Sequence, residues 1–290
     1  MPVMILRRRQ GKPGNRWQDR DFGLCSISRT RARRSPMKGA MTIAAVAVAT
    51  TLAGAGSVRA QDGLSFTLRG GAFMQPGYFG SDDLAYGPDF SISNLQLNYG
   101  GRELGGGPQD GLGLRGSFRY IGERTADDYS ELAGLDDVDA SLELGLGYGY
   151  VSRNFEAFAD LRYGVIGHES LVASVGADAV FYPTGALTMR FGPRVLFGSE
   201  EYANTYFGVS AAESVASAGQ FDAYEADGGP MTAGVELGMT YQINEDWGID
   251  GAVAYEQFVG AAADSPIVEQ GSEEQLSIRL GVTRNVSLGF

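Results

Sequence analysis

Cysteine, lysine and long apolar runs are almost missing from this chain of 290 residues. The only cysteine, Cys25, lies in an Arg-rich N-terminal stretch, so the rest of the chain can form neither a disulfide framework nor a cysteine-based metal site. No run of 18 apolar residues follows Gln61, which excludes a transmembrane helix from that part. Proline is sparse, whereas glycine is abundant, with 43 residues. Packing and hydrogen bonding must therefore stabilise the fold.

The charge is divided unevenly along the sequence. Both lysines, Lys12 and Lys38, precede residue 61, and beyond it 11 arginines face 33 Asp and Glu residues, a net charge of −22. A strongly acidic body repels nucleic acid, so we expect no nucleic-acid partner. We interpret most of the acidic residues as belonging to solvated loops.

The first 60 residues have the pattern of an export leader. Met37-Lys38 opens a basic segment, and an Ala/Val-rich stretch follows that ends in Val58-Arg59-Ala60. This pattern predicts a secretory signal peptide over 37–60 with maturation at Gln61. Residues 1–36 form a basic extension, and the position of the leader suggests a true start at Met37. Arg33-Arg34 also resembles a twin-arginine signal. We favour the ordinary secretory route, because the twin-arginine route carries folded cargo.

Beyond Gln61, apolar and polar residues alternate with the period of a β-strand. Leu142, Leu144 and Leu146 share one face of such a segment, for example, and Glu143 lies on the other. The segments have ten or more residues, close to the roughly 9–11 that a tilted strand needs to cross a bilayer, and tyrosines and phenylalanines gather at their ends. The pattern predicts an all-β fold: a transmembrane antiparallel up-and-down β-barrel over residues 61–290. We expect strands near 64–74, 89–100, 111–121, 138–151, 154–166, 170–182, 186–198, 230–242, 247–259 and 274–290.

Charged residues within these segments mostly fall opposite the apolar row. An arginine or lysine facing lipid at mid-depth costs about 2–4 kcal/mol, whereas a charge inside a barrel can find a partner or water. We therefore predict that the lumen is lined by Arg69, Arg115, Arg119, Glu143, Glu156, Asp160, Arg162, Asp178, Arg190, Arg194, Glu236, Asp250, Glu256 and Arg279.

Short and long connections between the segments nearly alternate. Ten strands would place both termini and the short turns in the periplasm and the long loops outside the cell. A further hairpin within 198–229 would instead give twelve strands. In the last segment Arg284 falls on the apolar face, and we expect it to snorkel to the interface, with the strand ending near Val286.

Residues that could support chemistry are few. His168 lies in Gly167-His168-Glu169-Ser170, which lacks the geometry of a lipid-deacylating triad because neighbours on a strand point to opposite faces, so we interpret it as a polar loop residue. Asp136, Asp137 and Asp139 lack EF-hand spacing and read as a solvated loop. Gly105-Gly106-Gly107 is not followed by Lys and a helix, so it is no phosphate loop. We predict no enzyme activity, cofactor or metal.

Three blocks resemble the MipA/OmpV family of outer-membrane proteins. The first loop reads P-G-Y-F-G-S-D-D, and Y-F-G-V-S and A-D-S-P-I-V follow in order. The resemblance implies an outer-membrane location in contact with lipid and lipopolysaccharide. It also implies a scaffold linking a murein lytic transglycosylase to a penicillin-binding synthase; the alternative is a narrow porin-like channel or an adhesin. The C-terminus departs from the family, with Arg284 and Val286 where an aromatic pair is usual. The matching positions are Pro76, Tyr78, Gly80, Ser81, Asp82, Asp83, Tyr206, Phe207, Gly208, Val209, Ser210, Asp264, Ser265 and Pro266.

Overall fold

The computed structural model describes residues 62–108 and 110–290. The predicted extension over 1–36 and signal peptide over 37–60 lie outside the described residues. Within the described part, no helix is long and apolar enough to span a membrane.

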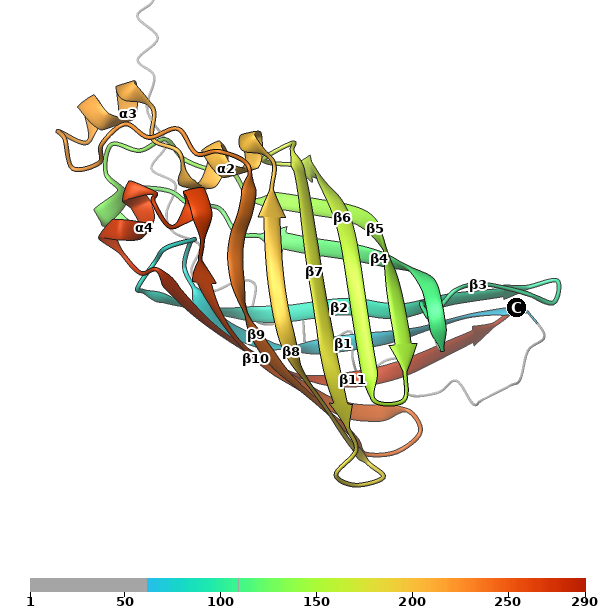
Figure 1. The fold of residues 1–290 in the computed structure, drawn as a ribbon. Coiled ribbons are helices and arrows are strands. Elements are labelled where there is room, and N and C mark those ends of the chain that lie inside the picture. Colours follow the sequence, from blue (N-terminus) through green and yellow to red (C-terminus); the bar gives the residue numbers. More distant parts are fainter. Residues whose placement is uncertain (1–61, 109) are drawn as a thin grey trace, which may run out of the picture. The chain divides into compact units, whose positions relative to one another are not determined.

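The described chain forms one antiparallel sheet that curls into a nearly closed barrel (Figure 1). Consecutive strands pair from β1 to β3 and from β4 to β11, and the first strand, β1, also pairs with the last, β11. The order across the sheet is β3-β2-β1-β11-β10-β9-β8-β7-β6-β5-β4. The strands are β1 (Gly63–Pro76), β2 (Leu84–Tyr99), β3 (Arg102–Gly105), β4 (Gly111–Ile121), β5 (Ser141–Ser152), β6 (Phe155–Ile166), β7 (Leu171–Phe181), β8 (Leu187–Gly198), β9 (Gly229–Gln242), β10 (Trp247–Phe258) and β11 (Glu274–Gly289).

The ten predicted long strands are confirmed. The one additional strand, β3, has four residues and lies in the connection between the predicted strands 89–100 and 111–121, where it forms an arm with the end of β2. The twelve-strand alternative is wrong. The 198–229 stretch forms helices α2 (Glu200–Phe207) and α3 (Ala211–Ala216), because Ser199 and Ser210 cap their first turns. In α3, Ser210 and Glu213 form a reciprocal capping box.

Burial in the barrel wall is inverted relative to a water-soluble sheet. On β5 the Glu143 side chain is fully buried, whereas its neighbours Leu144 and Leu146 are 47% and 66% exposed. The same reversal recurs along the other strands, where leucine, phenylalanine and tyrosine face outward. Apolar side chains pointing out and charges pointing in suit a wall surrounded by lipid.

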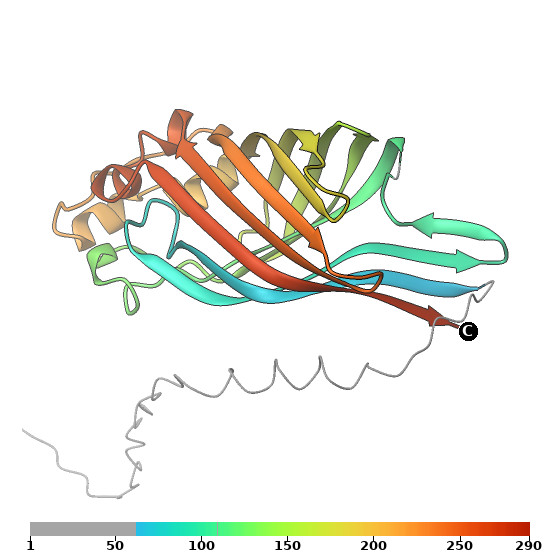
Figure 2. The same ribbon diagram turned by 90° about the horizontal axis from the view of Figure 1, so that it is seen from below.

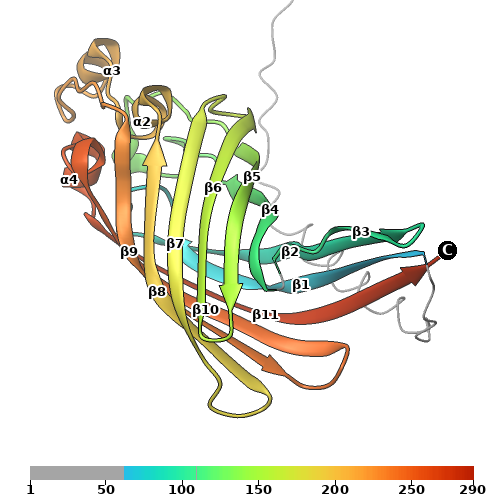
Figure 3. The same ribbon diagram turned by 45° about the vertical axis from the view of Figure 1, so that its right-hand side comes forward.

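The two ends of the barrel differ. Helices α2, α3, α4 (Pro266–Gln270), η1 (Ser130–Leu132) and η2 (Gly260–Ala262) all lie at one end, which we call the loop end (Figures 1 and 3). The short turns, the β2–β3 arm and the C-terminus lie at the opposite, turn end (Figure 2). This arrangement follows the predicted alternation of long and short connections.

The wall has one seam. Within residues 62–108 and 110–290, no hydrogen-bonded ladder joins β2 to β4, so the sheet ends there. Side chains from the loop end bridge this seam: Tyr78, just after β1, packs edge-to-face on Tyr129 at 5.0 Å, and the Arg119 guanidinium of β4 lies 5.5 Å from the Phe79 ring. The loops therefore help to hold the barrel edges together.

The last strand differs from its prediction at the end. It runs to Gly289, which pairs with Gly63 of β1, so the strand does not end near Val286. Arg284 lies over the indole of Trp247 at 5.0 Å. A cation–π contact with an aromatic on the neighbouring strand shields the charge on the outer face.

Candidate functional site

Four connections at the loop end pack into one structure, which we call the cap: residues 77–83, 122–140, 199–228 and 259–273. One hydrophobic core joins α2 to wall residues at the strand ends, with Tyr202, Phe207 and Met231 wholly or almost wholly buried. A second core is centred on Phe221 and Ile267. Cores of this kind are close-packed and exclude water, so the four connections form a packed structure at the loop end.

The three family-like blocks meet inside this cap. Phe79, from the first block, packs against the rings of Tyr206 and Phe207, from the second, at 5.1 and 5.7 Å. Ser265, from the third, donates a hydrogen bond from Oγ to the carbonyl of Phe207 at 2.6 Å. The blocks are more than 50 residues apart in sequence, and their common location makes the cap the candidate site.

Backbone geometry fixes the first block in place. Gly80 has φ of +91°, a conformation that a residue with a side chain adopts at a cost. A Cβ at Gly80 would lie 3.0 Å from the Val268 backbone, and the Gly80 carbonyl accepts a hydrogen bond from Ser272 N at 2.8 Å. Ser81 is buried and closes the turn by bonding to the backbone of Asp83. Asp82 and Asp83 are exposed.

The remaining motif residues have local roles. Pro76 ends β1, Gly208 ends α2, and Val209 forms an isolated bridge with Tyr224. Pro266 occupies the first turn of α4, where its missing N–H costs nothing. Asp264 is exposed just before α4.

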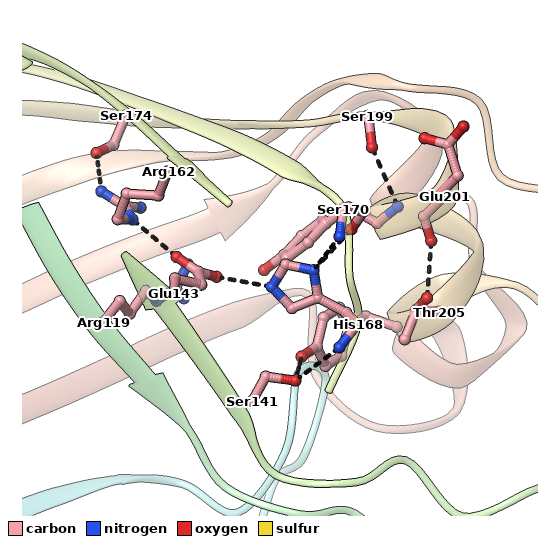
Figure 4. A network of polar contacts seen from close by, with 12 residues as sticks. Arg119, Ser141, Glu143, Arg162, His168, Ser170, Ser174, Ser199, Glu201 and Thr205 are labelled. Atoms are coloured by element: carbon pink, nitrogen blue, oxygen red, sulfur yellow. Dashed lines mark hydrogen bonds and ion pairs between the residues drawn. The ribbon is translucent and has the colours of Figure 1, made fainter. Parts of the chain in front are cut away.

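Beneath the cap lies a buried polar cluster, which we call the latch: Arg119, Ser141, Glu143, Arg162, His168 and Ser170 (Figure 4). Arg162 Nε donates to Glu143 Oε2 at 2.7 Å, and Arg119 Nη1 lies 3.9 Å from Glu143 Oε1. The cap joins the cluster through Tyr206, whose hydroxyl donates to Ser141 Oγ at 2.9 Å. The latch therefore ties α2 to the barrel wall.

His168 lies in the short connection between β6 and β7, as expected of a polar loop residue, but it is buried. Its side chain is fully buried, with Nε2 3.3 Å from Glu143 Oε1 and Nδ1 2.7 Å from Ser170 Oγ. The acidic partner is thus Glu143 of β5, which cannot be identified from the residues adjacent to His168 in the sequence. A serine hydrolase needs its serine open to substrate, whereas Ser170 is 4% exposed. The contacts favour a structural tie.

The predicted lumenal charges form a lattice of contacts. Arg194 Nη2 binds Asp178 at 2.9 Å and Glu236 at 3.2 Å, and Glu236 also binds Arg279 at 3.2 Å. Asp89, which the sequence analysis missed, pairs with Arg69 at 2.6 Å. The other contacts are Arg69–Asp250, Arg115–Asp160, Arg162–Asp160, Arg190–Glu156 and Thr232–Glu256. Every residue of the predicted set thus has a polar partner.

The acidic residues considered for calcium lie on the outside of the cap. Asp136, Asp137 and Asp139 are all exposed. Among the residues that the structure describes, no group of three or more His, Cys, Asp or Glu side chains is placed to hold a metal ion.

Buried tyrosines make the cap sensitive to alkali. Burial raises the pKa values of Tyr78, Tyr202 and Tyr206 above the ordinary value near 10. The folded state therefore favours the neutral phenols, and their contribution to stability is complete below about pH 10 and is lost as the pH rises further. We expect protease cleavage within 199–228 to accelerate above about pH 10, and less steeply in a Tyr78→Phe variant. Cleavage that stays constant across this range would contradict the assignment.

Comparison with known proteins identifies the family. A family model described as "MltA-interacting protein MipA" matches residues 68–286. The chain belongs to the MipA family. No curated protein matches it.

Similar solved structures include the outer membrane protein OprG from Pseudomonas aeruginosa, with 14% identity, 79% of this chain and 99% of that chain covered, and a TM-score of 0.25. The translocator domain of the autotransporter NalP from Neisseria meningitidis has 14% identity, coverage of 83% and 92%, and a TM-score of 0.38. These scores are too low to support a functional comparison.

The matched region contains the cap and most of the barrel wall. Together with the outward apolar face, membership of the MipA family makes this chain an outer-membrane β-barrel. The predicted fold class, family and location are confirmed.

Proposed function

We propose that this MipA-family barrel is a non-conducting membrane anchor that holds peptidoglycan-remodelling enzymes at the outer membrane. The observation that carries the proposal is the cap, which places two packed hydrophobic cores at the loop end and is tied to the latch by the Tyr206–Ser141 hydrogen bond. A channel would need a continuous polar path through this region. The name of the family supports a role in binding a murein lytic transglycosylase.

The turn end offers the surface for such a partner. In bacterial barrels the short turns face the periplasm, where enzymes of the cell wall act. The β2–β3 arm extends at this end, and it exposes Tyr99 and Leu104 by 65% and 60% (Figure 2). Exposed aromatic and aliphatic side chains on a projecting hairpin are suited to the apolar centre of a protein interface.

A pull-down tests the anchor role. Full-length protein in detergent should capture a purified MltA-type lytic transglycosylase, and the double variant Tyr99→Ser/Leu104→Ser should weaken capture by about tenfold or more, since buried interface anchors contribute above 1 kcal/mol each. Ile243→Ser is the matched control, because Ile243 is 53% exposed in another turn of the same end.

Failure of the unaltered protein to capture the enzyme would contradict the scaffold role. Equal loss in the Ile243→Ser control would show that the arm is not the docking surface. The alternative, a narrow channel or an adhesin, predicts conductance or binding through the cap instead.

A further inference from the structure

The outer side of the cap contains a cavity of about 670 Å³, within the usual range for small-molecule sites. It lies between the 122–140 connection and the segment that contains α2 and α3. Its polar lining residues are Arg124, Asp136, Asp137, Asn204, Thr205, Ser210, Glu213, Tyr224 and Glu225.

Arg124 is the unusual member of this lining. The residue is 5% exposed, and its guanidinium donates one hydrogen bond, from Nη1 to the Tyr206 carbonyl at 2.8 Å, while Nε has no partner. Within residues 62–108 and 110–290, no carboxylate lies within ion-pairing distance of it. A buried charge without a counter-ion is costly, so a cavity that it lines is suited to receive an anionic group.

The acidic residues of the cavity divide into two kinds. Glu213 is engaged, because its carboxylate accepts hydrogen bonds from Ser210 N at 2.7 Å and Asp136 N at 2.9 Å, and Asp137 accepts one from Ala126 N at 3.3 Å. Asp136 and Glu225 are exposed, and within the described part of the chain their carboxylates make no hydrogen bond or ion pair. These two groups are available to a cation.

We propose that this cavity binds an amino acid or short peptide that carries both a free carboxylate and ammonium groups. The carboxylate pairs with Arg124, and the ammonium groups pair with Asp136 and Glu225. One buried cation among four carboxylates favours a basic ligand over a neutral one. The site lies at the opposite end of the barrel from the proposed enzyme-docking arm, so either proposal can fail without the other.

Calorimetric titration of the full-length protein in detergent tests the site with L-lysine and with cadaverine, the same diamine without the carboxylate. We expect cadaverine to bind about tenfold more weakly, because it lacks the carboxylate that forms the charge-assisted hydrogen bond with Arg124. Equal affinity for the two would show that the cavity attracts only the ammonium groups, and this would overturn the proposal. The absence of lysine binding would overturn it as well. Titration with the dipeptide lysyl-lysine distinguishes a free amino acid from a peptide as the ligand, since tighter binding of the dipeptide indicates a peptide.

Variants assign the two halves of the site. Arg124→Gln should bind lysine and cadaverine equally. Because Arg124 is buried and its replacement could disturb the cap, the exposed pair Asp136→Asn/Glu225→Gln provides a second test and should weaken both ligands. Asp222→Asn, an exposed carboxylate outside the cavity, is the matched control and should leave both affinities unchanged. Unaltered lysine binding in the Asp136/Glu225 variant would overturn the proposal.

Discussion

Replacing Glu143 with glutamine should lower the free energy of unfolding by about 3–5 kcal/mol, the usual effect of breaking a buried ion pair. The carboxylate is fully buried and contacts Arg162 at 2.7 Å, His168 at 3.3 Å and Arg119 at 3.9 Å. Glutamine keeps the shape but leaves the buried guanidinium of Arg162 and the half-buried guanidinium of Arg119 without their shared counter-charge. Urea unfolding of the refolded protein in micelles measures the difference.

The control for this variant is Glu103→Gln. Glu103 is exposed on the β2–β3 arm and loses the same charge, so its effect should stay within about 0.5 kcal/mol. A loss below about 1 kcal/mol in Glu143→Gln, less than an ordinary core substitution, would mean that the latch does not stabilise the barrel.

Truncating Phe207 to alanine should destabilise the cap by about 3–5 kcal/mol, the range for a buried phenylalanine. Its side chain is almost fully buried and its ring lies 5.5 Å from Phe258 of the wall and 5.7 Å from Phe79. Because these contacts join the cap to β10, the loss should appear as local opening. Hydrogen exchange of amides in 199–228 should accelerate, with the strands of the wall little changed.

Val215→Ala is the matched control in the same connection. Val215 lies on α3 and is 80% exposed, so its truncation should leave the exchange rates unchanged. Equal exchange in the two variants would contradict the assignment of Phe207 to the cap core.

The wall was predictable because its pattern is local. Alternation with period two places Glu143 and Leu144 on opposite faces whatever their partners are, and only the inward face can keep a charge away from lipid. Applied to the other strands, the same rule predicts the full set of lumenal charges. It could not choose their partners, because register across strands such as β1 and β11 joins residues more than 200 positions apart. Asp89 was missed for a different reason: the predicted strand began at that residue, whereas β2 begins at Leu84, which places Asp89 within the wall beside Arg69 of β1.

The cap was much harder to predict. Capping signals at Ser199, Ser210 and Ser265 mark three helix starts, and the first two argue against a further hairpin within 198–229. Nothing local predicts that His168 meets Glu143, or that Phe79, Phe207 and Ser265 converge. These contacts depend on loop paths, which the alternation pattern leaves free.

Conductance of the refolded protein in a planar bilayer tests the central claim most directly. The packed cap and the paired lattice predict no steady channel for the full-length protein. Replacing 199–228 with a short turn removes α2 and its aromatic core, and should permit openings if the cap is what closes the loop end. Steady single-channel currents from the unaltered barrel would contradict the account and favour a pore.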